Sequence, residues 1–150
     1  MPIALHRRRF NCALLSLAAL AAAPIAALGR NRAAFQATRA DAALRALFAG
    51  KPLVAGENLD FRAPEIAEDG SIVPVTVSAP MPGVRSISLL VDANPNPLSA
   101  RFHFHEGAVA QFRTRIKMGE SSDVRAVVET DDALYVATRR VKVTLGGCGG

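Results

Sequence analysis

The pattern of apolar and polar positions divides the chain into a helical segment and a longer segment rich in strands. Across residues 33–48 apolar side chains recur at three- and four-residue intervals, which is the spacing of one face of an α-helix. Gly50 can take the left-handed conformation after a last helical turn, and Pro52 prevents continuation. We therefore predict one amphipathic N-terminal helix within residues 30–50. Its apolar face comprises Ala33, Ala37, Ala40, Leu44, Leu47 and Phe48.

After the predicted helix, residues 51–145 contain short runs of valine, isoleucine, phenylalanine and threonine, separated by proline, glycine, asparagine and aspartate. Val73, Val75 and Val77 alternate with other residues, so one side of that run faces a core. No gap between the runs accommodates a crossover helix, which disfavours a mainly parallel sheet. We predict an all-β fold, an immunoglobulin-like antiparallel β-sandwich of about seven strands, over residues 51–145. The predicted strands are residues 57–62, 72–78, 85–92, 100–105, 110–117, 124–129 and 134–145.

Residues 1–29 have the layout of an export signal, with a basic cluster before an uncharged apolar stretch. Arg7, Arg8 and Phe10 resemble the core of the twin-arginine signal, which predicts export to the periplasm by the twin-arginine route. We expect cleavage after Gly29, which leaves a mature protein outside the membrane. The alternative is an uncleaved anchor, which the short and weakly hydrophobic stretch disfavours.

Removal of this leader changes the charge and the cysteine content. The chain of 150 residues has 18 basic and 13 acidic residues, a formal net charge of +5. Loss of three leader arginines leaves 15 basic and 13 acidic residues, or +2. So small a charge, with no tryptophan and one tyrosine, disfavours a nucleic-acid partner. Cys12 is lost as well, so Cys148 becomes the single thiol, which either reacts or pairs between molecules.

Glycines on both sides of Cys148 make residues 146–150 a flexible C-terminal arm, because glycine tolerates both signs of φ. From Leu145 the thiol can swing roughly 10 Å. A nucleophilic enzyme needs its cysteine fixed beside a base, which a glycine tail does not provide. We therefore predict a covalent carrier without catalytic residues; the alternative is a structural sandwich that dimerises through a disulfide. The arm glycines are Gly146, Gly147, Gly149 and Gly150.

His103 and His105 lie two residues apart on a predicted strand, so they point to the same face and can share a metal ion. A third ligand would have to come from a carboxylate or from Cys148. We therefore predict neither a metal site nor a cofactor, and interpret the histidines as a polar strand face.

The chain resembles the SoxY family, the sulfur-carrying subunits of the bacterial thiosulfate-oxidation system. The resemblance implies that Cys148 holds sulfur derived from thiosulfate, as a cysteine S-thiosulfonate or a persulfide. It also implies a SoxZ-like partner subunit in a heterodimer or larger assembly, and transient contacts with SoxAX, SoxB and, where present, a sulfur dehydrogenase. The resemblance rests on GGCGG at 146–150, RIKMGESSDVR at 115–125, RRVKVTL at 139–145, NPNP at 94–97 and PEIAEDGSIVPV at 64–75.

Overall fold

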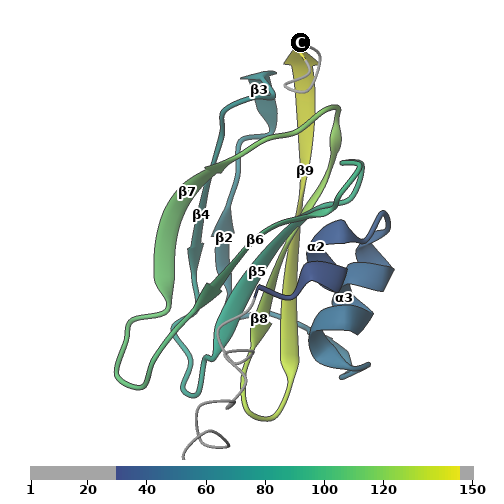
Figure 1. Ribbon diagram of the computed structural model, residues 1–150. Helices are drawn as coiled ribbons and strands as arrows, with labels where there is room; N and C mark the ends of the chain where they lie inside the picture. Colours follow the sequence, from purple (N-terminus) through teal and green to yellow (C-terminus); the bar gives the residue numbers. More distant parts are fainter. Residues whose placement is uncertain (1–29, 146–150) are drawn as a thin grey trace, which may run out of the picture. The chain divides into compact units, whose positions relative to one another are not determined.

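The computed structural model of the protein describes residues 30–145. The predicted export signal, with Arg7, Arg8 and Phe10, lies outside the described residues. So does the predicted arm, with Cys148 and its four glycines. Within the described part, two short helices precede nine strands (Figure 1). No helix of residues 30–145 is long and apolar enough to cross a membrane.

The nine strands form two sheets, which confirms the predicted β-sandwich and adds two strands to the expected number. The larger sheet has the order β1-β9-β8-β5-β6, with β3 also paired to β9, and the smaller has the order β2-β4-β7. The strands are β1 (Leu53–Ala55), β2 (Asp60–Arg62), β3 (Ile66–Asp69), β4 (Val73–Ser78), β5 (Ser86–Val91), β6 (Leu98–His103), β7 (Gln111–Ile116), β8 (Ser122–Glu129) and β9 (Leu134–Leu145).

The two strands that the sequence pattern did not predict, β1 and β3, both pair with β9, and both pair in parallel. The sandwich is therefore antiparallel except at these two edges. Each strand is short, three and four residues, and only Ala67 of β3 is buried. An exposed strand of this length shows no alternation of apolar and polar residues, which explains why the pattern failed to reveal either one.

The prediction of a single helix across residues 33–48 is wrong. The structure has α2 (Arg32–Gln36) and α3 (Ala40–Phe48), separated by extended backbone at Ala37 and Arg39. The alanines of both helices continue one apparent periodicity, which hides the break. Ala33, assigned to the apolar face, is exposed. The residues that the two helices bury are Ala34, Ala43, Leu44 and Phe48.

Two apolar cores lie on opposite faces of the larger sheet. The main core lies between the sheets and contains the alternating Val73, Val75 and Val77 of β4, as predicted. The second core lies between the helices and the sheet, where Leu44 and Phe48 pack with Leu90, Val127 and their neighbours. All six residues of β5 are buried, because that strand is covered on both faces. The outer face of the smaller sheet has no such cover among residues 30–145 (Figure 1).

Candidate functional site

The last strand, β9, leads directly to residues 146–150, which contain the predicted carrier cysteine. It is the longest strand of the described chain, with 12 residues. Its first eight residues, from Leu134 to Val141, pair with β8. The short strands β1 and β3 pair with its beginning and its end. The backbone that precedes the predicted arm is therefore fixed to neighbouring strands along its length.

The end of β9 is held by β3 and the turn that follows it. The backbone N–H of Gly70 donates a hydrogen bond of 2.8 Å to the carbonyl of Leu145. The hydroxyl of Thr144 donates to the carbonyl of Glu68, also at 2.8 Å. In Figure 1 the short β3 lies beside the end of β9. Because Leu145 is the last described residue, these bonds fix the point from which residues 146–150 continue.

The turn after β3 is stabilised by a local hydrogen bond to a carboxylate. The backbone N–H of Ser71 donates to Oδ1 of Asp69 at 2.7 Å. Hydrogen bonds from Ser71, by its side chain and its backbone, lower the pKa of Asp69 below its usual value of 3.8. The carbonyl of Gly70 in this turn accepts a 2.7 Å hydrogen bond from the N–H of Met118. The turn therefore connects the end of β9 to the chain segment that follows β7.

The two histidines considered as metal ligands lie at the surface. His103 ends β6 and His105 follows it, and both are exposed. Phe102, between Arg101 and His103, packs against the main core and stacks on Phe112 with ring centroids 4.0 Å apart. Residues 30–145 contain no group of three or more His, Cys, Asp or Glu side chains that could hold a metal ion.

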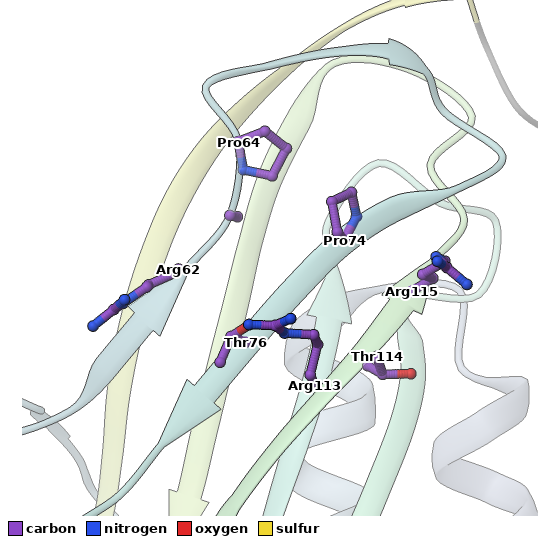
Figure 2. Close-up of a pocket in the computed structure, with 8 residues that line it drawn as sticks. Arg62, Pro64, Pro74, Thr76, Arg113, Thr114 and Arg115 are labelled. Carbon is purple, nitrogen blue, oxygen red and sulfur yellow. The ribbon is translucent and has the colours of Figure 1, made fainter.

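The structure reveals a basic surface that the sequence reasoning missed. Arg62 on β2, Thr76 on β4 and Arg113 on β7 are register partners in one row across the smaller sheet. With Arg115, two residues further along β7, they line a hollow of about 840 Å³, together with Ala63, Pro64, Pro74 and Thr114 (Figure 2). No carboxylate lines this hollow. We call the surface formed by Arg62, Thr76, Arg113 and Arg115 the basic face.

Side chains two residues apart on a strand face the same side, so the predicted strand 110–117 already places Arg113 and Arg115 together. This alternation was the only sequence signal for the basic face. Low net charge obscured that signal, because net charge does not show where charges gather. Of the three arginines, Arg62 has an acidic neighbour: it donates two hydrogen bonds to Asp60, at 3.0 and 2.7 Å. Those bonds lower the pKa of Asp60 and raise that of Arg62.

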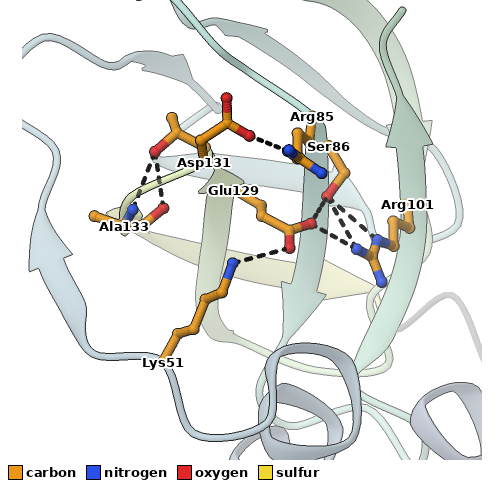
Figure 3. Close-up of polar contacts among 8 residues, drawn as sticks. Lys51, Arg85, Ser86, Arg101, Glu129, Asp131 and Ala133 are labelled. Carbon is orange, nitrogen blue, oxygen red and sulfur yellow. Dashed lines mark hydrogen bonds and ion pairs between the residues drawn. The ribbon is translucent and has the colours of Figure 1, made fainter.

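On the larger sheet, by contrast, an arginine is enclosed in a polar network beneath the helices (Figure 3). Arg101 bonds to Glu129 at 2.8 Å, and the two side chains are only 15% and 16% exposed. Glu129 also accepts a 2.8 Å hydrogen bond from the Ser86 hydroxyl and contacts Lys51 at 3.6 Å. The guanidinium of Arg101 lies 5.2 Å from the ring centroid of Phe48. This network connects the segment after α3 to the sheet.

The fold and its anchored last strand define a class of protein, a two-sheet β-sandwich whose strand β9 leads into the segment that contains Cys148. The family described as "Sulfur oxidation protein SoxY" matches residues 44–148, so its matched region ends at Cys148. The chain belongs to the SoxY family.

A solved structure agrees with this assignment. The structure described as "Structure of the sulfur carrier protein SoxY from Chlorobium limicola f thiosulfatophilum" is similar, with a TM-score of 0.64 and 36% sequence identity. The similarity covers 70% of this chain and 96% of that chain. No curated protein matches the chain. The family and the structural neighbour together support a role as a sulfur carrier in the Sox system of sulfur oxidation.

Proposed function

We propose that this chain carries the sulfur intermediates of thiosulfate oxidation covalently on Cys148 and presents them on residues 146–150, which act as a swinging arm. The observation that carries the proposal is the family match, which extends through the sandwich to Cys148. The anchored end of β9 supports it, because a mobile arm delivers its cargo reproducibly when its root is fixed. The body positions the arm and the arm holds the substrate.

The chemistry assigns Cys148 the role of attachment site. In loading, the thiol and thiosulfate form a sulfur–sulfur bond and release one proton and two electrons, which yields a cysteine S-thiosulfonate. The electrons pass to a haem enzyme of the SoxAX type. In a following hydrolysis of the SoxB type, water attacks the terminal sulfonate group, which leaves as sulfate. A persulfide remains on Cys148. Where a sulfur dehydrogenase is present, it oxidises the remaining sulfane sulfur.

The chain itself supplies no catalytic residue in this scheme. Nucleophilic catalysis by cysteine requires a base held at hydrogen-bond distance. A cysteine between glycines has no fixed neighbour of this kind in sequence, so the enzymes that receive the arm activate the thiol. We propose that the working form pairs with a SoxZ-like subunit, and that the twin-arginine signal in residues 1–29 directs it to the periplasm and is then removed.

Substitution of Cys148 by serine tests the carrier role. The Cys148→Ser variant should retain the fold and lose all thiosulfate oxidation in the reconstituted system, because serine forms no persulfide. Intact mass of the wild-type protein, after incubation with thiosulfate and the oxidising partner, should show a thiosulfate-derived addition on the C-terminal peptide. If turnover survives in Cys148→Ser, or wild-type protein shows only a disulfide dimer, the carrier assignment is wrong and a structural sandwich remains.

A second variant tests the arm itself. Replacing Gly147 with tryptophan should leave the unfolding temperature unchanged, because the residue lies beyond β9. The bulky side chain should slow loading and unloading by narrowing the paths that the arm can take into a partner enzyme. Labelling of Cys148 by a small alkylating reagent is the control and should proceed as in the wild type. Equal enzymatic rates in the two proteins would contradict the arm model.

A further inference from the structure

Most arginines of the larger sheet have a carboxylate partner, whereas two of the three on the smaller sheet have none within residues 30–145. Four arginines on or next to strands of the larger sheet each have a carboxylate partner. On the smaller sheet Arg62 has Asp60, whereas Arg113 and Arg115 form no ion pair or side-chain hydrogen bond with any residue of 30–145. Two unpaired arginines therefore lie together on β7, whereas Arg139 and Lys142, also without an ion pair within residues 30–145, lie on β9 of the larger sheet. The partnered arginines are Arg85 with Asp131, Arg101 with Glu129, Arg125 with Asp92, and Arg140 with Asp123.

The two unpaired arginines lie close together on a rigid strand. Residues two apart on one strand face the same side and are separated by roughly 7 Å. Both arginines are exposed, whereas Ile116 on the same strand is buried, so β7 directs its charges outward. Like charges at this spacing repel weakly in water, where solvent and salt screen them. An anionic surface that covers both arginines would pair with them and remove this repulsion.

Within residues 30–145, no helix covers the basic face. Helices α2 and α3 cover the larger sheet, as Figure 1 shows, and none of residues 30–145 forms a helix on the outer side of β2, β4 and β7. In Figure 2 the side chain of Arg113 extends over β4 toward Thr76. The hollow of about 840 Å³ is much larger than a single inorganic anion needs. Its size and exposure suit several carboxylates on a protein surface.

The position of the basic face relates it to the carrier arm. Gly70 donates to the carbonyl of Leu145 and accepts from the N–H of Met118, and Met118 is three residues beyond Arg115. One turn therefore links the end of β9 with the end of β7. The end of β7 that carries Arg115 is therefore connected through this turn to the point from which residues 146–150 continue.

We propose that the basic face docks an acidic protein surface on the enzyme that loads Cys148. This inference rests on the proposed function, because a carrier needs a surface that its loading enzyme recognises. Guanidinium groups pair with carboxylates through two parallel hydrogen bonds, which favours arginine at such a surface. Complementary charge raises the association rate by tenfold or more at low ionic strength, and salt reduces the effect.

The experiment measures association of the carrier, paired with its SoxZ-like subunit, with purified SoxAX, by stopped-flow mixing at several sodium chloride concentrations; sedimentation checks that each variant keeps that pairing. All proteins carry Cys148→Ser, so that binding is observed without loading. Reversal of both charges, Arg113→Glu with Arg115→Glu, should slow association at low salt at least tenfold and flatten its salt dependence. The matched control, Arg39→Glu with Arg45→Glu, makes the same change in net charge at exposed residues of the helix layer. It should change the rate less than twofold.

Three outcomes would contradict the docking assignment. Equal rates for the charge-reversed and parent proteins, or equal losses in the control, overturn the docking assignment. So does a change in self-association, seen by sedimentation, without a change in enzyme binding, because it assigns the face to a second copy of the chain. If charge reversal impairs folding, Arg113→Gln with Arg115→Gln replaces it. If the parent protein with Cys148→Ser binds SoxAX through this face, but the wild-type protein gains no thiosulfate-derived mass in the separate loading assay, the proposed function is contradicted and the docking assignment is intact.

Discussion

Truncation of Glu129 to alanine should destabilise the protein more than the loss of any exposed ion pair. Glu129 is 16% exposed and bonds to Arg101 at 2.8 Å, to Ser86 at 2.8 Å and to Lys51 at 3.6 Å. Removing one partner of a buried ion pair costs about 3–5 kcal/mol, because the remaining charge is left uncompensated. Arg101 keeps some contact with water and with Ser86, so the expected loss lies at or below the lower limit of this range, about 2–3 kcal/mol.

Thermal and urea unfolding measure this loss. For a domain of this size, about 2–3 kcal/mol corresponds to a decrease in Tm of roughly 10 °C. The control is Asp123→Ala, which removes the exposed partner of Arg140 at 3.4 Å and should cost less than about 1 kcal/mol. The double variant Glu129→Ala with Arg101→Met should be more stable than Glu129→Ala, because no unpaired guanidinium remains. Similar losses for Glu129→Ala and Asp123→Ala would refute the reasoning.

Two further predictions concern the root of the arm. Hydrogen bonds from Ser71 lower the pKa of Asp69, so its stabilising contribution is present above pH 3.8 and is lost as the pH falls through the lowered value. NMR hydrogen exchange should show the protection factor of the Ser71 amide falling over that range, and unchanged protection would contradict the assignment. Thr144→Val should remove the 2.8 Å bond to Glu68 and cost about 1 kcal/mol locally. It should accelerate amide exchange at the end of β9 while exchange in β5 stays slow; uniform acceleration would show that this bond stabilises the whole fold.

The sequence predicted the elements whose burial follows a period. Val73, Val75 and Val77 indicated β4 because one side of that strand packs in the main core. The pattern failed for β1 and β3, since their pairing with β9 is long-range and leaves little side-chain burial to detect. It failed also at the break between α2 and α3, because alanine is compatible with both faces of a helix.

The candidate site, too, could be predicted from the sequence only in part. The assignment of Cys148 as the carrier residue needs only its residue type and its neighbouring glycines, and it stays a prediction because Cys148 lies outside the described residues. The basic face required the register of three strands, which brings together Arg62, Thr76 and Arg113, far apart in the sequence. No local pattern encodes such a row. The hydrogen bond that holds the end of β9 is equally non-local, because Gly70 and Leu145 meet only in the folded chain.

The pairing of β9 also determines how the body responds to mechanical load. If residues 146–150 act as the proposed arm, a partner enzyme that holds them while the carrier separates pulls on the end of β9. Its antiparallel hydrogen bonds to β8 lie perpendicular to the strands, so this tension shears them together and does not open them one by one. The bonds to β1 and β3 share the load at either end. The body should therefore withstand repeated extraction of its arm without partial unfolding.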